Sequence, residues 1–276
     1  MFETLSENLL FFVKTYILFW PLFVLIERAF PYKHVPFFSR DLRTELISGL
    51  FNPVFMAHIN KLLYTFCSIY ILTPYLPFQI FNATIETWPF TLQVALAIFL
   101  IDFIQYLRHR FAHRFIWNFH AMHHAVSDLR ASVHFKMHPI ETIVNNLFLI
   151  IILYVLGFNA HAILWGEYIF IIYNLWNHIN INLSYPSVFR YLFASPNFHK
   201  WHHAKGIEGK DKNFCSIFPI FDILGKTYYY PKGQLPESYG VMKVDNTDPL
   251  YQSFSGAFMY PFKKMYKQFK KEETSS

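Results

Sequence analysis

Residues 88–107, "WPFTLQVALAIFLIDFIQYL", form an apolar run that leads directly into a histidine-rich stretch. A helix needs about 20 mostly apolar residues to cross a 30 Å hydrocarbon layer, and this run has that length. Further runs approaching this length lie at 8–26, 46–76, 142–156 and 160–177, the second interrupted by a proline and a lysine. The sequence therefore predicts an all-α, polytopic integral membrane protein.

Composition supports the membrane class. Hydrophobic residues make up 54% of the chain and charged residues 15%, whereas soluble domains carry about 25% charged residues. The net charge is +6, and we assign it to a membrane surface, with no nucleic acid as partner. The first run follows acidic residues and not a basic leader, so it is interpreted as a retained membrane helix.

The distribution of charge predicts an orientation. Four basic residues lie within 27–43 and eleven lysines after residue 204, whereas 1–8 and 77–88 hold only acids among their charged residues. Because basic residues favour the cytosolic side, everything from Arg108 onward is expected on that side, including a histidine-rich cap. The exception is the hairpin of 142–156 and 160–177, which is expected to enter the membrane and return. The sequence leaves open a bacterial inner membrane or the endoplasmic reticulum.

Two triplets share the spelling H-x-x-H-H: "HAMHH" at 120–124 and "HKWHH" at 199–203. On a helix, positions i, i+3 and i+4 lie on one face about 100° wide. A third pattern, "HRFAH" at 109–113, puts two histidines four residues apart at the end of the 88–107 run. All these imidazoles are expected just inside the membrane.

Asp102 is the one acid in that apolar run. It shares a helical wedge of roughly 60° with Tyr106, His109 and His113. A carboxylate there is a candidate functional residue, and the outer N–H of a metal-bound imidazole is its expected partner. An ion pair with a neighbouring arginine is the alternative.

Eight histidines in these patterns are too many for one tetrahedral ion and suit two metal ions, each with an open coordination position. A pH-sensing cluster and a haem site are weaker alternatives, because neither needs a duplicated triplet.

In order along the chain, the three patterns resemble the histidine boxes of the fatty acid hydroxylase / sterol desaturase superfamily, integral-membrane enzymes with a non-haem di-iron centre. "HPIE" at 138–141 and "NHIN" at 177–180 resemble two further motifs of that family. For the histidines of these two motifs, hydrogen bonding inside a helical hairpin is the alternative, and Asn182 is a further candidate. The resemblance implies these metal ligands: His109, His113, His120, His123, His124, His178, His199, His202 and His203, with His138 as a ligand or a neighbour of one.

The resemblance also implies an activity. Two iron ions would use O2 as co-substrate to hydroxylate a C–H bond of a lipid substrate, with no catalytic residue beyond the metal ligands. Electrons would come from a separate electron-transfer protein. The alternatives are a lipid desaturase on the same scaffold, a membrane zinc protein without oxygenase activity, and a transporter. The expected organisation is N-terminal membrane helices in 1–90, the catalytic domain in 91–240 and a basic cytosolic tail in 241–276.

The chain departs from the family after the third box. The segment "DKNFCSIFPIFDILGKTYYY" has Cys215, Phe221 and Leu224 where the family often has glycine, tryptophan and phenylalanine. The substrate identity of a relative is therefore not transferred to this chain.

Overall fold

A computed structural model describes residues 18–67, 85, 87–145 and 158–274, without the side chains of residue 160 and of most residues in 53–67. The described residues are helical or irregular and hold no strand, only an isolated bridge between Ala204 and Tyr239. The predicted all-α fold is confirmed for this part of the chain.

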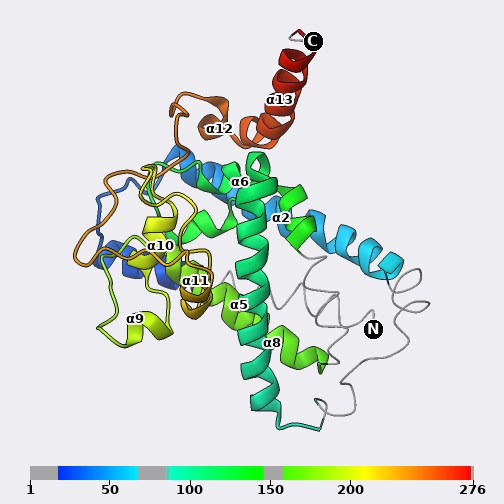
Figure 1. The fold of residues 1–276 in the computed structure, drawn as a ribbon, viewed down its shortest axis with the longest axis vertical. Helices are drawn as coiled ribbons and strands as arrows, with labels where there is room; N and C mark the ends of the chain where they lie inside the picture. The colour runs from blue at the N-terminus through cyan, green and yellow to red at the C-terminus, as the bar shows by residue number, and fades with distance from the viewer. Residues whose placement is uncertain (1–17, 68–84, 86, 146–157, 275–276) are drawn as a thin grey trace.

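The helices follow one another in the order shown in Figure 1. Those with both ends described are α2 (Arg40–Cys67), α5 (Phe90–Phe115), α6 (Trp117–His124), the 3-10 helix η2 (Ala131–Phe135), α8 (Ala160–His178), α9 (Phe189–Leu192), α10 (Pro196–His202), α11 (Ile220–Leu224), α12 (Pro249–Gln252) and α13 (Phe254–Glu273). Residues 18–29 and 139–145 are helical as well.

Helix α5 is, within the described residues, the one helix long and apolar enough to cross a membrane. The predicted spans 8–26, 46–76 and 142–156 fall partly on residues outside the description, so a multi-pass topology stays a prediction. Helix α2 continues through positions 53 and 61. The proline and the lysine that interrupt the apolar run therefore do not end the helix, since a proline removes only one backbone hydrogen bond.

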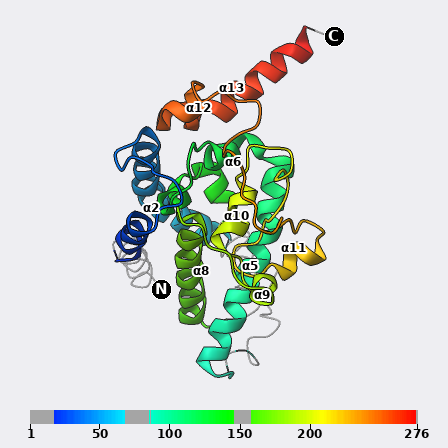
Figure 2. The ribbon, with the colours of Figure 1, turned by 90° about the vertical axis from the view of Figure 1, so that its left-hand side faces the viewer.

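Helices α5 and α8 pack along each other (Figures 1 and 2). Gly166 of α8 permits the approach, because a Cβ at that position would lie 2.9 Å from Ile101 Cδ1 and 3.1 Å from Ala97 Cβ. Small residues at a crossing let two helix backbones come close. This contact fixes the helix that ends at His178 against the helix that carries His109.

The other histidine-bearing helices are positioned by local signals. Helix α6 begins after a one-residue break at Ile116, which redirects the chain at the end of α5. Helix α10 begins with a serine cap, since Ser195 accepts the N–H of Phe198, and with Pro196 in its first turn. Both residue types are favoured at helix starts. Helix α10 then packs against α8.

The segment predicted as a basic tail packs in part against α6. Val241, Leu250 and Ala257 are buried in one cluster with Ala121 and Met122 of α6. Beyond that contact, α13 extends away from the body (Figures 1 and 2). From residue 263 onward it exposes three large apolar side chains and carries five lysines: Met265, Tyr266 and Phe269, with Lys263, Lys264, Lys267, Lys270 and Lys271.

Candidate metal centre

Nine histidines gather in two groups. Cluster 1 and cluster 2 each bring their candidate ligand atoms within 4.8 Å of one another. The two clusters adjoin, because the rings of His124 and His203 stack with centroids 4.5 Å apart. All nine belong to the ligand set that the sequence predicted. Cluster 1 holds His109, His113, His120, His124 and His202, and cluster 2 holds His123, His178, His199 and His203.

Each H-x-x-H-H box is divided between the clusters. In the box of α6, His120 and His124 face cluster 1 while His123 faces cluster 2. The box of α10 does the reverse, so that its i, i+4 pair joins cluster 2 and its i+3 residue, His202, joins cluster 1. Helix geometry explains the division, because positions i and i+4 differ by about 40° whereas i+3 and i+4 differ by about 100°.

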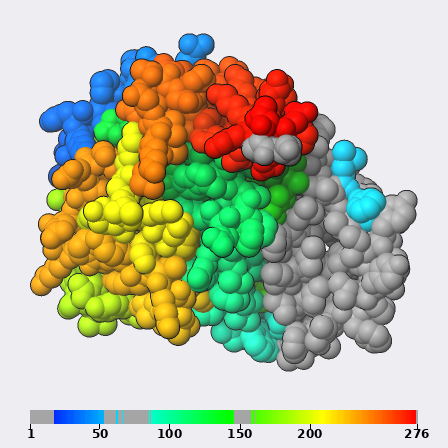
Figure 3. Space-filling model, turned by 45° about the horizontal axis from the view of Figure 1, so that its top comes forward, coloured from blue at the N-terminus to red at the C-terminus, as the bar shows by residue number. Residues whose placement is uncertain are grey.

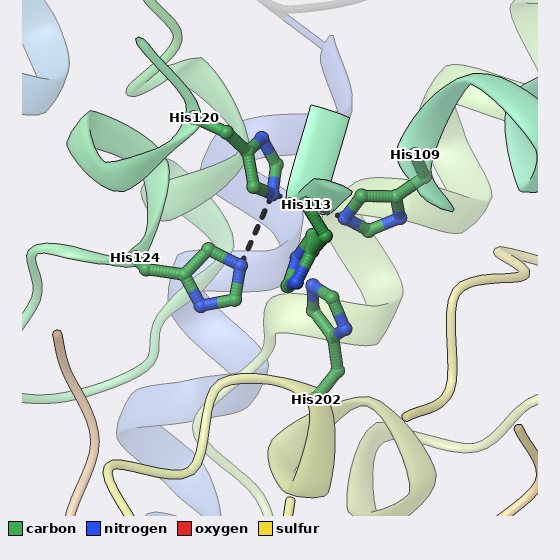
Figure 4. Close-up of side chains that lie close together, drawn as sticks. All are labelled: His109, His113, His120, His124 and His202. Atoms are coloured by element: carbon green, nitrogen blue, oxygen red, sulfur yellow. Dashed lines mark hydrogen bonds between the residues drawn. The ribbon is translucent and has the colours of Figure 1, made fainter. Parts of the chain in front are cut away.

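Cluster 1 draws its side chains from three helices (Figure 4). The Nε2 atom of His120 lies 3.1 Å from Nε2 of His109 and 3.1 Å from Nε2 of His124. Nitrogens that share one metal ion at about 2.1 Å lie roughly 3.0–3.4 Å apart. The buried Nε2 atoms of His113 and His202 have no hydrogen-bond partner among the described residues. The spacing and the unpaired atoms fit a shared cation.

The tautomers of cluster 1 support the same fit. The Nδ1 atom of His109 lies 2.9 Å from the Phe214 carbonyl, and that of His202 lies 2.8 Å from the Lys212 carbonyl. A carbonyl only accepts, so both Nδ1 atoms carry the proton and both neutral rings turn an Nε2 lone pair toward the cluster. Lone pairs facing one another at close range repel unless a cation lies between them. This arrangement is that of metal-ligating imidazoles.

Cluster 2 repeats the pattern with four rings. The Nε2 atom of His178 lies 3.0 Å from that of His199, 3.2 Å from that of His203 and 3.3 Å from that of His123. The Nδ1 atom of His178 donates to the Asn174 carbonyl at 2.7 Å, which leaves its Nε2 lone pair for the cluster.

Burial keeps the rings uncharged. Burial and the neighbouring histidines hold the pKa values of His123, His124, His199 and His203 well below the ordinary value of 6.5. Burial likewise lowers the pKa of His202 to about 3. Metal ligation requires the neutral imidazole, so these rings are in the state that binds a cation.

Two carboxylates contact Nδ1 atoms of cluster 1, the ring nitrogens that face away from the cluster. Neither carboxylate was assigned this role from the sequence. The buried Glu141 accepts from Nδ1 of His120 at 2.6 Å, and the exposed Asp211 lies 3.2 Å from Nδ1 of His113. A signal for Glu141 existed in the "HPIE" motif, three residues after its histidine. Asp211 lies in a loop rich in lysines and acids, where no sequence motif indicates a functional residue.

Replacing Glu141 with glutamine is expected to weaken metal binding by about 10- to 100-fold, because carboxylate partners fix the tautomer and raise the basicity of a ligating imidazole. Competition with a chelator of known affinity, read as metal retained per chain, measures the effect. The matched control is Glu237→Gln, since Glu237 is an exposed acid that belongs to neither cluster. Equal retention in Glu141→Gln and the native chain would contradict the assigned role.

Asp102 has other partners than the sequence predicted. Its carboxylate accepts the backbone N–H groups of Ser216, Ile217 and Phe218 at 2.7–3.1 Å, and no bond to an imidazole or an arginine occurs among the described side chains. The buried Asp222 accepts the two preceding N–H groups, those of Phe214 and Cys215, at 2.9 Å each. Two buried carboxylates thus bind five consecutive backbone amides of the 214–218 loop.

That loop supports cluster 1. Its Phe214 carbonyl holds His109, and the Lys212 carbonyl just before it holds His202. Asp222 accepts the N–H of Cys215, which shares a peptide unit with the Phe214 carbonyl, so it positions His109 through the backbone. Asp102 accepts the next three amides of the same loop.

Two of the further candidates lie outside both clusters. Nε2 of His138 lies 3.1 Å from the Phe258 carbonyl, and its Nδ1 accepts the N–H of Ile140. Both ring nitrogens are engaged within the fold, so His138 is left out of the ligand set proposed below. Asn182 accepts from Asn197 instead of facing His178, because α8 ends at His178.

Two buried lysines hold the backbone that follows the ligand helices. Lys200, inside the third box, donates to the carbonyls of Ile179 and Ile181 at 3.1 and 2.8 Å, just after α8. Lys136 donates to the carbonyl of Ala125, just after α6. Burial lowers the pKa of Lys200 to about 7. These bonds satisfy carbonyls at helix ends that lack an intrahelical partner.

The comparisons with known proteins agree with this geometry. The profile of the family described as "Fatty acid hydroxylase" matches residues 94–227, which include all nine clustered histidines. The part of the chain that carries both clusters is therefore similar to the fatty acid hydroxylase family. No solved structure matches it significantly.

Two curated proteins are similar to this chain. Ornithine lipid hydroxylase OlsE of Rhizobium tropici is 28% identical over 179 residues, which cover 64% of this chain and 52% of that protein. Alkylglycerol monooxygenase of Caenorhabditis elegans is 25% identical over 177 residues, covering 61% of this chain and 32% of that protein. The matched region thus spans about half of the first relative and a third of the second.

Proposed function

We propose that this protein is a membrane-bound, O2-dependent, non-haem di-iron oxidoreductase that hydroxylates a C–H bond of a lipid. The observation that carries the proposal is the pair of adjoining histidine clusters, whose Nε2 atoms converge at metal-ligand spacing. The printed names of the relatives, a lipid hydroxylase and a monooxygenase, support the same reaction class.

The donor set suits iron. Nine imidazoles and no carboxylate within the clusters give nitrogen ligation, which borderline metals such as iron and zinc accept. Hydrolytic zinc sites usually pair three protein ligands with a nearby acidic base, and both clusters exceed that number of histidines. When bound, two iron ions would supply the activation of O2 and the oxidising power that a C–H bond requires.

The chain's own residues prepare the site. Cluster 1 would hold one ion and cluster 2 the other. Backbone carbonyls and Glu141 keep the Nδ1 protons in place, so that the Nε2 lone pairs face inward. Eight of the nine rings are buried, which limits water at the reacting centre. The protein thus contributes binding, orientation and a largely dry environment, while the metals contribute the redox chemistry.

Location and partners belong to the same proposal. We place the catalytic unit within 91–240, anchored by α5 as a membrane helix with its histidine-bearing end in the cytosol. The lipid substrate then reaches the clusters from the bilayer. Electrons come from a separate electron-transfer protein.

The test combines metal content with turnover. Purified protein in nanodiscs is expected to hold about two iron ions per chain and to form a hydroxylated lipid, with 18O from 18O2 in the product, when a chemical reductant supplies electrons. Mass spectrometry of the lipid reads both mass and label. Zinc that iron does not replace under anaerobic reconstitution, or no metal at all, would overturn the proposal. An unlabelled alkene product would replace hydroxylation with desaturation.

A further inference from the structure

A cavity of about 840 Å³ opens beside cluster 1. Three of that cluster's histidines line it, His113, His124 and His202, and no histidine of cluster 2 does. A volume of this size is typical of small-molecule sites. A molecule in this cavity therefore meets cluster 1.

The rim of the cavity is basic. Arg110, Arg114 and Lys210 line it, and its single lining acid, Asp211, is engaged with His113. Arg114 and Lys210 are exposed and have no ion-pair partner among the residues that the structure describes. In Figure 3 the surface of α5 and α6 (green) meets the segment that follows α10 (yellow), which carries Lys210. Unpaired cations at the rim favour an anionic group.

An apolar stripe leads to the same cavity. Phe99, Phe103, Leu107, Phe111 and Phe115 follow one another at four-residue intervals along α5, so they form one winding stripe on the helix. Four of them are substantially exposed, from 39% at Phe103 to 69% at Phe115, and the last three line the cavity. The stripe runs along the helix that is apolar enough to cross a membrane.

We infer that this cavity binds the anionic headgroup of an amphiphile, with Arg114 and Lys210 holding a phosphate or carboxylate and the α5 stripe holding the chain. The inference rests on the proposed function, for which it names the substrate class: lipids with a negatively charged headgroup. Charge at the rim and apolar surface below it match the two ends of such a molecule. The part of the lipid between them lies at the opening lined by His113, His124 and His202.

Binding can be measured without turnover. Trp117 lines the cavity, and its ring lies 5.0 Å from that of His113. Metal-free protein in phosphatidylcholine nanodiscs is titrated with bromododecyl phosphate, whose bromine quenches tryptophan fluorescence, and with bromododecyltrimethylammonium. The phosphate is expected to quench saturably and to bind at least about tenfold more tightly than the ammonium. Trp117→Phe should remove the saturable signal.

The variants test the rim. Arg114→Glu combined with Lys210→Glu is expected to raise the dissociation constant of the phosphate probe at least about tenfold, since two favourable contacts become repulsive. Lys232→Glu, a charge reversal at an exposed lysine outside the cavity, should leave it unchanged. Circular dichroism and the metal content after loading show whether the double variant folds.

Three results would overturn the inference: equal affinity for both probes, an unchanged constant in a folded double variant, or displacement by methyl phosphate as effective as by dodecyl phosphate, which would indicate a site for free phosphate. Because the titration uses metal-free protein, failure of the di-iron proposal leaves this measurement valid. Normal iron content and hydroxylation with no phosphate preference would reject the headgroup assignment alone.

Discussion

Replacing His124 with alanine is expected to lower the iron content from about two ions per chain to about one, and product formation by at least about 100-fold. His124 belongs to cluster 1, so cluster 2 keeps its four rings. Replacing His203 with alanine is expected to lower the iron content equally, but by loss of the other ion, since His203 belongs to cluster 2. Elemental analysis of purified protein measures the metal, and mass spectrometry of the lipid product measures turnover.

A matched control separates ligand loss from a general effect of losing a histidine. His161 is exposed near the start of α8 and lies in neither cluster, so His161→Ala should keep both iron and activity. Combining His124→Ala with His203→Ala should remove nearly all iron. Full iron occupancy in either single variant would contradict the division of the histidines into two metal positions.

Replacing Asp222 with alanine is expected to destabilise the fold by at least about 2 kcal/mol, because each buried donor left unpaired costs about 1–3 kcal/mol. The N–H groups of Phe214 and Cys215 lose their acceptor. The hydroxyl of Thr227 loses the carboxylate but keeps the Asp222 backbone carbonyl, at 3.5 Å. Asp102→Ala leaves three backbone N–H groups without an acceptor and should destabilise the fold to a similar extent. The unfolding midpoint in detergent, at one fixed scan rate, gives the order of the variants.

The aspartate variants also predict a selective metal defect. Asp222→Asn keeps one carboxamide oxygen as acceptor and is expected to fold, with a loosened 214–218 loop. Because that loop holds His109 and cluster 2 has its own acceptor at Asn174, iron should be lost from cluster 1 first. Glu237→Ala, at an exposed position, should shift neither midpoint nor iron content. A native midpoint in Asp222→Ala would reject the role of the two carboxylates.

The sequence predicted what helix periodicity alone determines. The i, i+4 spacing of His109 and His113, and the helix face that they share with Asp102 and Tyr106, follow from 3.6 residues per turn. Three of these four residues, Asp102, Tyr106 and His109, are buried on α5. The three helical elements that carry the boxes could also be placed from the sequence. These are local properties, which residues close in the chain settle.

Contacts between distant segments could not be predicted. The carboxylate of Asp102 was expected to meet an imidazole, but its partners are amides more than a hundred residues away. Such a partner depends on how α5 and the 214–218 loop pack, and a loop of mixed composition gives no signal of that. The assignment of His202 to one cluster and His203 to the other likewise depends on the direction from which α6 and α10 approach.

Each H-x-x-H-H box contributes histidines to both clusters, and this division restricts which substitutions can alter one cluster alone. Removing either H-x-x-H-H segment takes nitrogens from both clusters, because each segment contributes to each. Inserting one residue between the first and last histidines of a box would rotate part of the set by about 100° and send rings to the wrong neighbour. To remove one proposed metal position and keep the other, individual histidines on several helices must therefore be replaced. Exchanging a whole H-x-x-H-H segment is expected to disrupt both positions.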